Sequence, residues 1–171
     1  MSASSDPAPF AGQVIPVDLH DDRHASSVLR LLEQYSLDVM GGEKPLLPEV
    51  RRHLIERLRS FPTYVGLLAE EAGEFVGLAN GFKNFSTFTA RPVINVHDLS
   101  VDPQHRGRGI GQAILEEMSR RARQQGCSYL TLEVRADNPA RRLYRRCGFV
   151  GGDPQTDELA FWKKRLDEET V

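Results

Sequence analysis

Residues 93–124 read VINVHDLSV (93–101), DPQHRGRGIG (102–111) and QAILEEMSRRARQ (112–124), and they are the most informative part of the sequence. The first part is apolar and β-branched, which predicts a strand. Asp102-Pro103 ends this strand, because proline cannot donate a hydrogen bond to a sheet. The last part has apolar residues four positions apart, from Ile110 to Ala122, which predicts a helix. Three glycines at alternate positions connect the two elements.

This junction of strand, glycine loop and helix is typical of a phosphate-binding site. Glycine lets backbone N–H groups approach a ligand closely, and the first turn of a helix leaves several N–H groups unpaired and partly positive. A P-loop would need a lysine after Gly111, and the dinucleotide fingerprint would need glycine where Gln112 stands. The loop therefore belongs to neither motif, although a nucleotide-phosphate enzyme remains an alternative.

Two segments resemble the GNAT N-acetyltransferase superfamily. Residues 104–109, QHRGRG, match its Gln/Arg-x-x-Gly-x-Gly/Ala signature, and residues 138–149, NPARRLYRRCGF, match its second motif, an Asn followed by Leu-Tyr and Gly-Phe. The resemblance extends over residues 64–166. The nearest branch acetylates diamines and polyamines and has a Leu-Glu-Asp run where this chain has Val96-His97-Asp98. His97 in place of the glutamate is a departure from that branch.

The resemblance implies both a fold and an activity. The expected class is α/β (α+β by stricter schemes), with a mixed, mostly antiparallel central sheet that is splayed between its fourth and fifth strands and flanked by helices. The implied enzyme is an acetyl-CoA-dependent N-acetyltransferase that moves an acetyl group to a primary amine by direct attack in a ternary complex. A homodimer is also implied. The alternative function is a non-catalytic acyl-CoA-binding sensor module.

The resemblance also assigns the cofactor site. The backbone of the glycine loop is expected to bind the pyrophosphate, and residues 99–101 to pair with the pantetheine arm as a peptide adds to a sheet edge. Arg106 and Arg108 either add charge or are solvated, and Asn138 either bonds the pantetheine or caps a helix. The expected cofactor-binding residues are Leu99, Ser100, Val101, Arg106, Gly107, Arg108, Gly109, Ile110, Gly111, Asn138 and Tyr144.

Two residues are candidates for proton transfer. Tyr144, a phenol with an ordinary pKa near 10, is implied to lie beside the CoA sulfur as a proton donor; the alternative is a packing tyrosine. His97, with an ordinary pKa near 6.5, suits a general base, and the alternative is a structural strand histidine. Asp98 either steers a cationic amine or braces the strand. Adjacent strand residues point to opposite faces, so His97 and Asp98 cannot both face the amine unless a bulge intervenes.

Composition sets the remaining expectations. The 171 residues predict a single domain at 13–166 with a flexible start at 1–12 and a tail at 167–171. A net charge of −2 gives no general attraction to nucleic acid or membranes. The absence of a long apolar run and of a signal-like start favours the cytoplasm. The histidines lack metal-ligand spacing, so no metal is expected.

The remaining patterns predict a chain of strands and helices. A longer loop at 84–92 is expected to border the acceptor cleft, whose amine the sequence leaves open. The expected strands are 14–19, 64–70, 75–85, 93–101, 128–135 and 157–166, and the expected helices begin after Asp21-Asp22, at Pro48, at Ile110 and at Pro139 and end near Gly41-Gly42, Leu58, Gly126 and Gly148.

Overall fold

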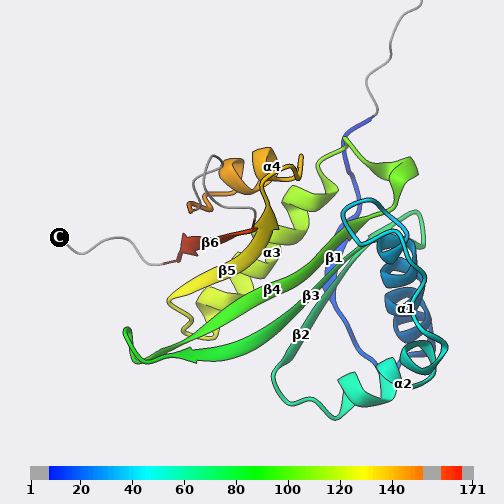
Figure 1. The fold of residues 1–171 in the computed structure, drawn as a ribbon, viewed down its shortest axis with the longest axis horizontal. Coiled ribbons are helices and arrows are strands. Elements are labelled where there is room, and N and C mark those ends of the chain that lie inside the picture. The colour runs from blue at the N-terminus through cyan, green and yellow to red at the C-terminus, as the bar shows by residue number, and fades with distance from the viewer. Residues whose placement is uncertain (1–7, 152–158, 167–171) are drawn as a thin grey trace, which may run out of the picture.

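A six-stranded sheet forms the centre of the computed structural model, which describes residues 8–151 and 159–166 (Figure 1). The strands are β1 (Gln13–Pro16), β2 (Tyr64–Glu71), β3 (Glu74–Ser86), β4 (Arg91–Val101), β5 (Tyr129–Arg135) and β6 (Leu159–Arg165), and they lie side by side in chain order. The helices are α1 (Asp22–Ser36), α2 (Pro48–Arg59), the short 3₁₀ helix η1 (Pro103–His105), α3 (Ile110–Gln124) and α4 (Arg141–Arg146). The expected tail at 167–171 and the first two residues of the expected last strand lie outside the described residues.

The sheet is mostly antiparallel and opens between β4 and β5. These two strands are parallel and pair only at Ile94 with Leu130 and at Asn95 with Thr131. All the other neighbours are antiparallel. Beyond Asn95, β4 therefore has an edge that β5 does not cover. This confirms the predicted class and the predicted splay between the fourth and fifth strands.

Helices cover both faces of the sheet, because side chains alternate along each strand. On β2, Leu67 contributes to the core under α3, whereas Leu68 contributes to the core under α1. The first core also includes Ile114 and Leu115 of α3, and the second includes Leu31 of α1. In Figure 1, α1 and α2 lie on one side of the sheet and α3 on the other.

Helix α1 begins as predicted but ends earlier. The side chain of Asp21 accepts hydrogen bonds from the backbone of Arg23 and His24, which caps the first turn. The helix stops at Ser36, five residues before the predicted end at Gly41-Gly42. Asp38 explains the difference, because its carboxylate accepts from Met40 N and its carbonyl accepts from three following amides. These local bonds compete with helical ones.

The expected long loop between β3 and β4 is a tight hairpin instead. The ladder continues to the pair Ser86 and Arg91, and Ala90 takes a positive φ of 51° in the turn. Phe88 at the tip is fully exposed. None of residues 84–92 is among those that line the cavity between β4 and β5.

Of the expected flexible start at 1–12, the structure describes residues 8–12 alone. Residues 8–12 are tied to the glycine loop and the β2–β3 turn, since Phe10 N donates to the carbonyl of Arg108 at 2.8 Å and Ala11 N to Glu71 Oε1 at 3.4 Å. Helix α4 starts at Arg141 rather than Pro139. Among the helices of the described residues, none has both the length and the apolar character to span a membrane.

Candidate active site

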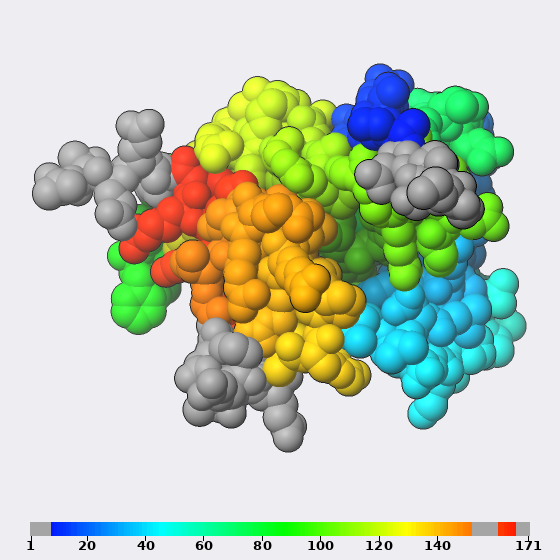
Figure 2. All heavy atoms as spheres, turned by 90° about the horizontal axis from the view of Figure 1, so that it is seen from above, coloured from blue at the N-terminus to red at the C-terminus, as the bar shows by residue number. Residues whose placement is uncertain are grey.

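A cavity of about 550 Å³ lies where β4 and β5 separate. Its size is within the range of small-molecule and cofactor sites. The surface is hollowed between the cyan and the orange parts of the chain in Figure 2. The opening of the sheet brings together groups from both faces, which are Tyr35, Asp38, Met40, Leu99, Ser100, Val101, His105, Arg106, Gly107, Gly109, Ile110, Gly111, Gln112, Asn138, Pro139, Ala140, Leu143, Tyr144 and Arg146.

The glycine loop presents backbone N–H groups to this cavity. Gly107 and Gly109 have φ values of 79° and 89°, in the left-handed region that glycine adopts without strain. Gly109 is the N-cap of α3 and has no side chain to satisfy the first-turn amides. Within residues 8–151 and 159–166, no acceptor bonds the backbone N–H groups of 107–112. This end of α3 is therefore an open anion-binding surface.

Arg108 holds the loop from outside the cavity. Its guanidinium donates to both carboxylate oxygens of Glu71, at 2.5 and 2.7 Å, and to the carbonyl of Ala8 at 2.6 Å. The bond from Arg108 is the main reason that the pKa of Glu71 lies below its usual value. Arg108 was expected to offer charge to a cofactor or to be solvated. Its side chain instead makes a bidentate ion pair and does not line the cavity.

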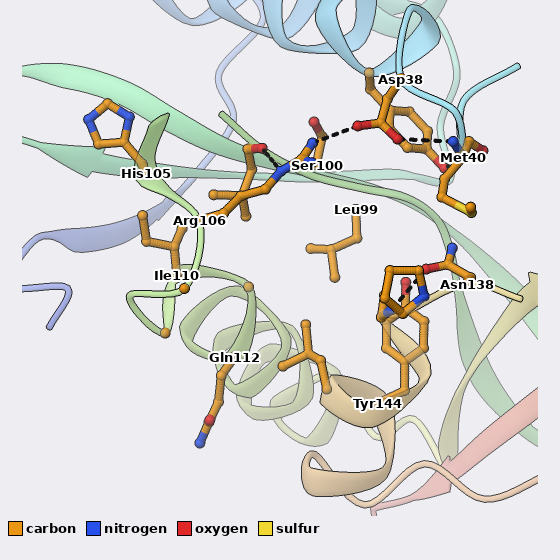
Figure 3. A pocket seen from close by; sticks show the side chains of 18 of the residues that line it. Asp38, Met40, Leu99, Ser100, His105, Arg106, Ile110, Gln112, Asn138 and Tyr144 are labelled. Carbon is orange, nitrogen blue, oxygen red and sulfur yellow. Dashed lines mark hydrogen bonds and ion pairs between the residues drawn. The ribbon is translucent and has the colours of Figure 1, made fainter. Parts of the chain in front are cut away.

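Arg106 lies inside the cavity and connects its two sides. Its Nε donates to the carbonyl of Val101 at 3.0 Å, and its terminal nitrogen donates to Asp38 at 3.0 Å (Figure 3). Asp38 belongs to the segment after α1, so this ion pair joins the glycine loop to the helix layer on the other face of the sheet. The bond from Met40 N, followed by that from Arg106, lowers the pKa of Asp38.

Tyr144 and Asn138 line the cavity opposite Arg106. Tyr144 is 8% exposed, its ring packs edge-on against Phe149, and no hydrogen bond joins its hydroxyl to the rest of the described chain. Burial, with a smaller effect of Tyr35, raises its pKa. Asn138 Oδ1 accepts from Ala140 N at 2.8 Å, and Asn138 lies three residues before the first residue of α4, the helix it was expected to cap. Figure 3 shows Tyr144 and Asn138 beside Leu99.

His97 and Asp98 lie beyond the cavity lining, where β4 is irregular. Asn80 pairs with Asp98 but Gly81 pairs with Val96, so His97 is an extra residue in the ladder. This is the bulge that two adjacent side chains need in order to interact on one side. His97 Nδ1 lies 3.2 Å from Asp98 Oδ1, and this bond raises the pKa of His97 despite partial desolvation.

The sequence analysis missed the contribution of the chain after α1. Tyr35, near the end of α1, lines the cavity together with Asp38 and Met40. Burial, then the nearby carboxylate of Asp98, raises the pKa of Tyr35. Gln112 was also missed. The polar residues around Gly41-Gly42 were the available signal, but no local pattern says which distant loop they face.

The site carries no feature of a metal centre. In the part of the chain that the structure describes, His, Cys, Asp and Glu side chains do not gather in a group of three that could hold a metal ion.

The predicted site residues fall into two groups, those that line the cavity and those that do not. All of the predicted cofactor residues except Arg108 line the cavity, together with Tyr144, whereas His97 lies outside its lining.

Comparison with known proteins identifies the family. Residues 28–149 match the model of the acetyltransferase (GNAT) family. The N-acetyltransferase YhfO of Bacillus subtilis is 30% identical over 132 residues, which are 73% of this chain and 83% of that protein. Streptothricin acetyltransferase of Streptomyces lavendulae is 36% identical over 89 residues, 52% of this chain and 44% of that protein.

Solved structures share the fold. A GNAT-family protein from Desulfovibrio desulfuricans has a TM-score of 0.68 at 21% identity, covering 92% of this chain and 100% of that one. YncA from Salmonella typhimurium, solved with its cofactor acetyl-CoA, has a TM-score of 0.68 at 20% identity, covering 94% and 96%. The architecture, the family match and the YhfO relationship agree: this chain belongs to the GNAT acetyltransferase family.

Proposed function

We propose that this protein transfers the acetyl group of acetyl-CoA to a primary amine by direct attack in a ternary complex. The observation that carries the proposal is the row of backbone amides at 107–112, which no acceptor among the described residues bonds and which opens on the same cavity as the Tyr144 hydroxyl. One end of the cavity offers donors for a diphosphate, and the other offers a proton donor for a leaving group. The acetyl-CoA bound by YncA supports the same cosubstrate here.

The cavity accounts for each part of the cosubstrate. The amides of the glycine loop and the first turn of α3 bind the pyrophosphate. The free edge of β4 at 99–101 pairs with the amides of the pantetheine arm, since β5 has separated from it. Asn138 has its Oδ1 occupied by Ala140 N, so its amide nitrogen is the group that can donate to the arm. Arg106 adds positive charge at the phosphate end.

Acetyl transfer to an acceptor that arrives as an ammonium then requires three proton movements. His97 Nε2 takes a proton from the acceptor ammonium, directly or through water, and the neutral amine attacks the thioester carbonyl carbon. The C–S bond breaks, and the CoA thiolate takes the proton of Tyr144. The nitrogen of the former amine loses its second proton to form the amide, and that proton, passed through water, restores the Tyr144 phenol. The raised pKa of Tyr144 keeps this phenol protonated at neutral pH, which is the state that a proton donor needs.

A thiol-release assay tests the proposal. Purified protein is given acetyl-CoA with one amine at a time, from a panel of monoamines, diamines, polyamines, amino acids and peptides. We expect free CoA to appear only with an acceptor, in equal amount to the acetylated amine found by mass spectrometry. Calorimetric binding of CoA without turnover on any amine would overturn the proposal and favour an acyl-CoA-binding module.

A further inference from the structure

A line of hydrogen bonds runs through three strands and ends at His97. The Tyr64 hydroxyl lies 2.9 Å from Asn80 Oδ1, and Asn80 Nδ2 lies 3.0 Å from Asp98 Oδ2. The other oxygen of Asp98 lies 3.2 Å from His97 Nδ1. Tyr64 is on β2, Asn80 on β3 and the remaining two on β4. The sequence analysis considered His97 as a base and Asp98 as a steering or bracing group, and it gave no role to Tyr64 or Asn80.

The chemistry of the groups fixes the direction of every bond. An ionised carboxylate only accepts hydrogen bonds, so the Asn80 amide nitrogen must face Asp98. The amide oxygen of Asn80 then faces Tyr64, whose hydroxyl must donate to it. At the other end, Asp98 accepts from Nδ1–H of His97. In neutral His97 the lone pair is therefore on Nε2, because only one ring nitrogen carries a proton.

An inner residue of this line, Asn80, is buried, so its hydrogen bonds are needed for the stability of the fold. Asn80 is 3% exposed, and a buried amide is costly unless both of its polar atoms are bonded, as they are here. The Asp98 side chain is 18% exposed and that of His97 is 64% exposed. The line thus runs from a buried amide at Asn80 to a surface imidazole, and the exposure of its side chains increases from Asn80 through Asp98 to His97.

The hydrogen bond to Asp98 is what fixes the position of the His97 ring. The Phe82 ring contacts the His97 ring edge-on, with centroids 5.9 Å apart. The charged groups that act on His97 are Asp98 beside it and Glu133 of β5, which Asn95 holds through its side-chain amide. Burial, and after it the charge of Asp98, raises the pKa of Tyr64 on β2 and of Tyr35 on α1, so these are the titratable groups that face Asp98 from those elements. Among these, only Asp98 bonds the ring of His97 within the described residues.

We propose that Asn80 and Tyr64 are positioning residues that hold Asp98, and through it hold His97 in the tautomer whose Nε2 accepts the proton of the acceptor amine. This inference rests on the proposed function, in which His97 is the base. Neither Asn80 nor Tyr64 touches the reacting atoms. Their effect is on the orientation and tautomer of the imidazole, as a hydrogen-bonded partner fixes the tautomer of other functional histidines.

The test combines kinetics with a spectroscopic signature. Asn80→Leu replaces the amide with an apolar side chain of similar size, and we expect kcat to fall about tenfold, as for a misplaced catalytic group, with KM for acetyl-CoA unchanged. Tyr64→Phe is the milder variant, with an expected loss of about threefold. In a His97→Ala background, Asn80→Leu should cause no further loss. Ser119→Ala removes one buried hydrogen bond under the opposite face of the sheet and is the control, with unchanged kcat.

Nitrogen-15 NMR of the histidines gives a readout that needs no substrate. Above the pKa of His97, we expect the Nδ1–H tautomer in the unsubstituted protein and a mixture of tautomers in Asn80→Leu. An Nε2–H tautomer in the unsubstituted protein, or equal losses from Asn80→Leu with and without His97, would overturn the inference. Amine acetylation that survives in His97→Ala with an unchanged pH profile would remove His97 as the base while leaving the acetyltransferase intact.

Discussion

The proposed chemistry depends on one group, the hydroxyl of Tyr144. Its ring is buried, but its oxygen has no partner in the described chain and faces the cavity. Tyr144→Phe keeps the ring packing against Phe149 and removes only the proton donor. Because general acids contribute about 10²- to 10⁴-fold, we expect kcat to fall by about 10²-fold or more while the calorimetric Kd for CoA is unchanged. A variant that keeps both kcat and Kd would exclude Tyr144 from proton transfer.

The pH dependence of the reaction reports on His97. A general base works unprotonated, so kcat/KM should fall as the pH drops through the pKa of His97. The bond to Asp98 raises that pKa, which places the fall above pH 6.5, the ordinary histidine value. Asp98→Asn removes the negative charge and should move the acid limb to lower pH. Asp137→Asn, at an exposed carboxylate that pairs with Arg135, should leave the limb in place; a shift in both variants would contradict the assignment.

At the residue scale, local motifs predicted much of the candidate site. The alternate glycines were assigned from their spacing between a strand and a helix, whereas Asn138 and Tyr144 were assigned through the family resemblance, and all of them line the cavity. Arg108 shows the limit of such reasoning. Its partner Glu71 is 37 residues away, and no periodicity links the two. The sequence analysis likewise named a bulge only as the condition under which His97 and Asp98 could face the same side. It could not predict the bulge, because the bulge depends on the register of β4 with β3.

The glycine loop is held from outside the cavity by a clamp, which consists of Arg108, its ion pair with Glu71 and its bonds to residues 8–12. Glu71 and residues 8–12 hold Arg108, and Arg108 in turn fixes the backbone between Gly107 and Gly109. Glu71→Gln removes the charge from this clamp without touching the cavity. We expect the loop amides to lose their preorganised alignment and KM for acetyl-CoA to rise roughly three- to tenfold, with kcat for the amine little changed.

The control for this variant is Glu74→Gln, three residues along in the same hairpin. Glu74 is exposed, and in the described residues it makes no ion pair, so its substitution should leave KM unchanged. Equal KM values for the Glu71 variant and the unsubstituted protein would mean that the loop keeps its shape without the clamp. A fall in kcat with an unchanged KM would also contradict this account.

Element boundaries were predictable where the signal was local. Asp21 and Pro48 mark the starts of α1 and α2 because a cap and a fixed proline φ act within one turn. The end of α1 was misplaced because Asp38 offers its carboxylate and carbonyl to the following amides, and the glycines come only after that turn. The β3–β4 hairpin was read as a loop because its strands continue through Phe85 and Pro92, where ladder pairing outweighs local propensity.

At the scale of the whole molecule, the cavity is lined by residues from both faces of the sheet. Tyr144 belongs to the core under α3, whereas Tyr35 comes from α1, which packs on the other face. They meet around one cavity only because β5 leaves β4 after Asn95. The sequence predicted this splay through family resemblance rather than through residue patterns. Parallel pairing between distant segments has no local signal, so the residues after α1 could not be assigned to the site from the chain alone.

This arrangement predicts that cofactor binding stabilises the molecule as a unit. A ligand that contacts the glycine loop, α4 and the segment after α1 binds the folded state alone, so at 100 times its Kd it adds about 2.7 kcal/mol to the free energy of unfolding. For a domain of this size the melting temperature should rise by about 5–10 °C in one transition. Differential scanning fluorimetry with CoA and acetyl-CoA measures this shift, with Glu71→Gln needing more ligand for the same rise. ATP at equal concentration is the comparison, and an equal rise with ATP would mean that the loop recognises phosphate without the pantetheine arm along β4.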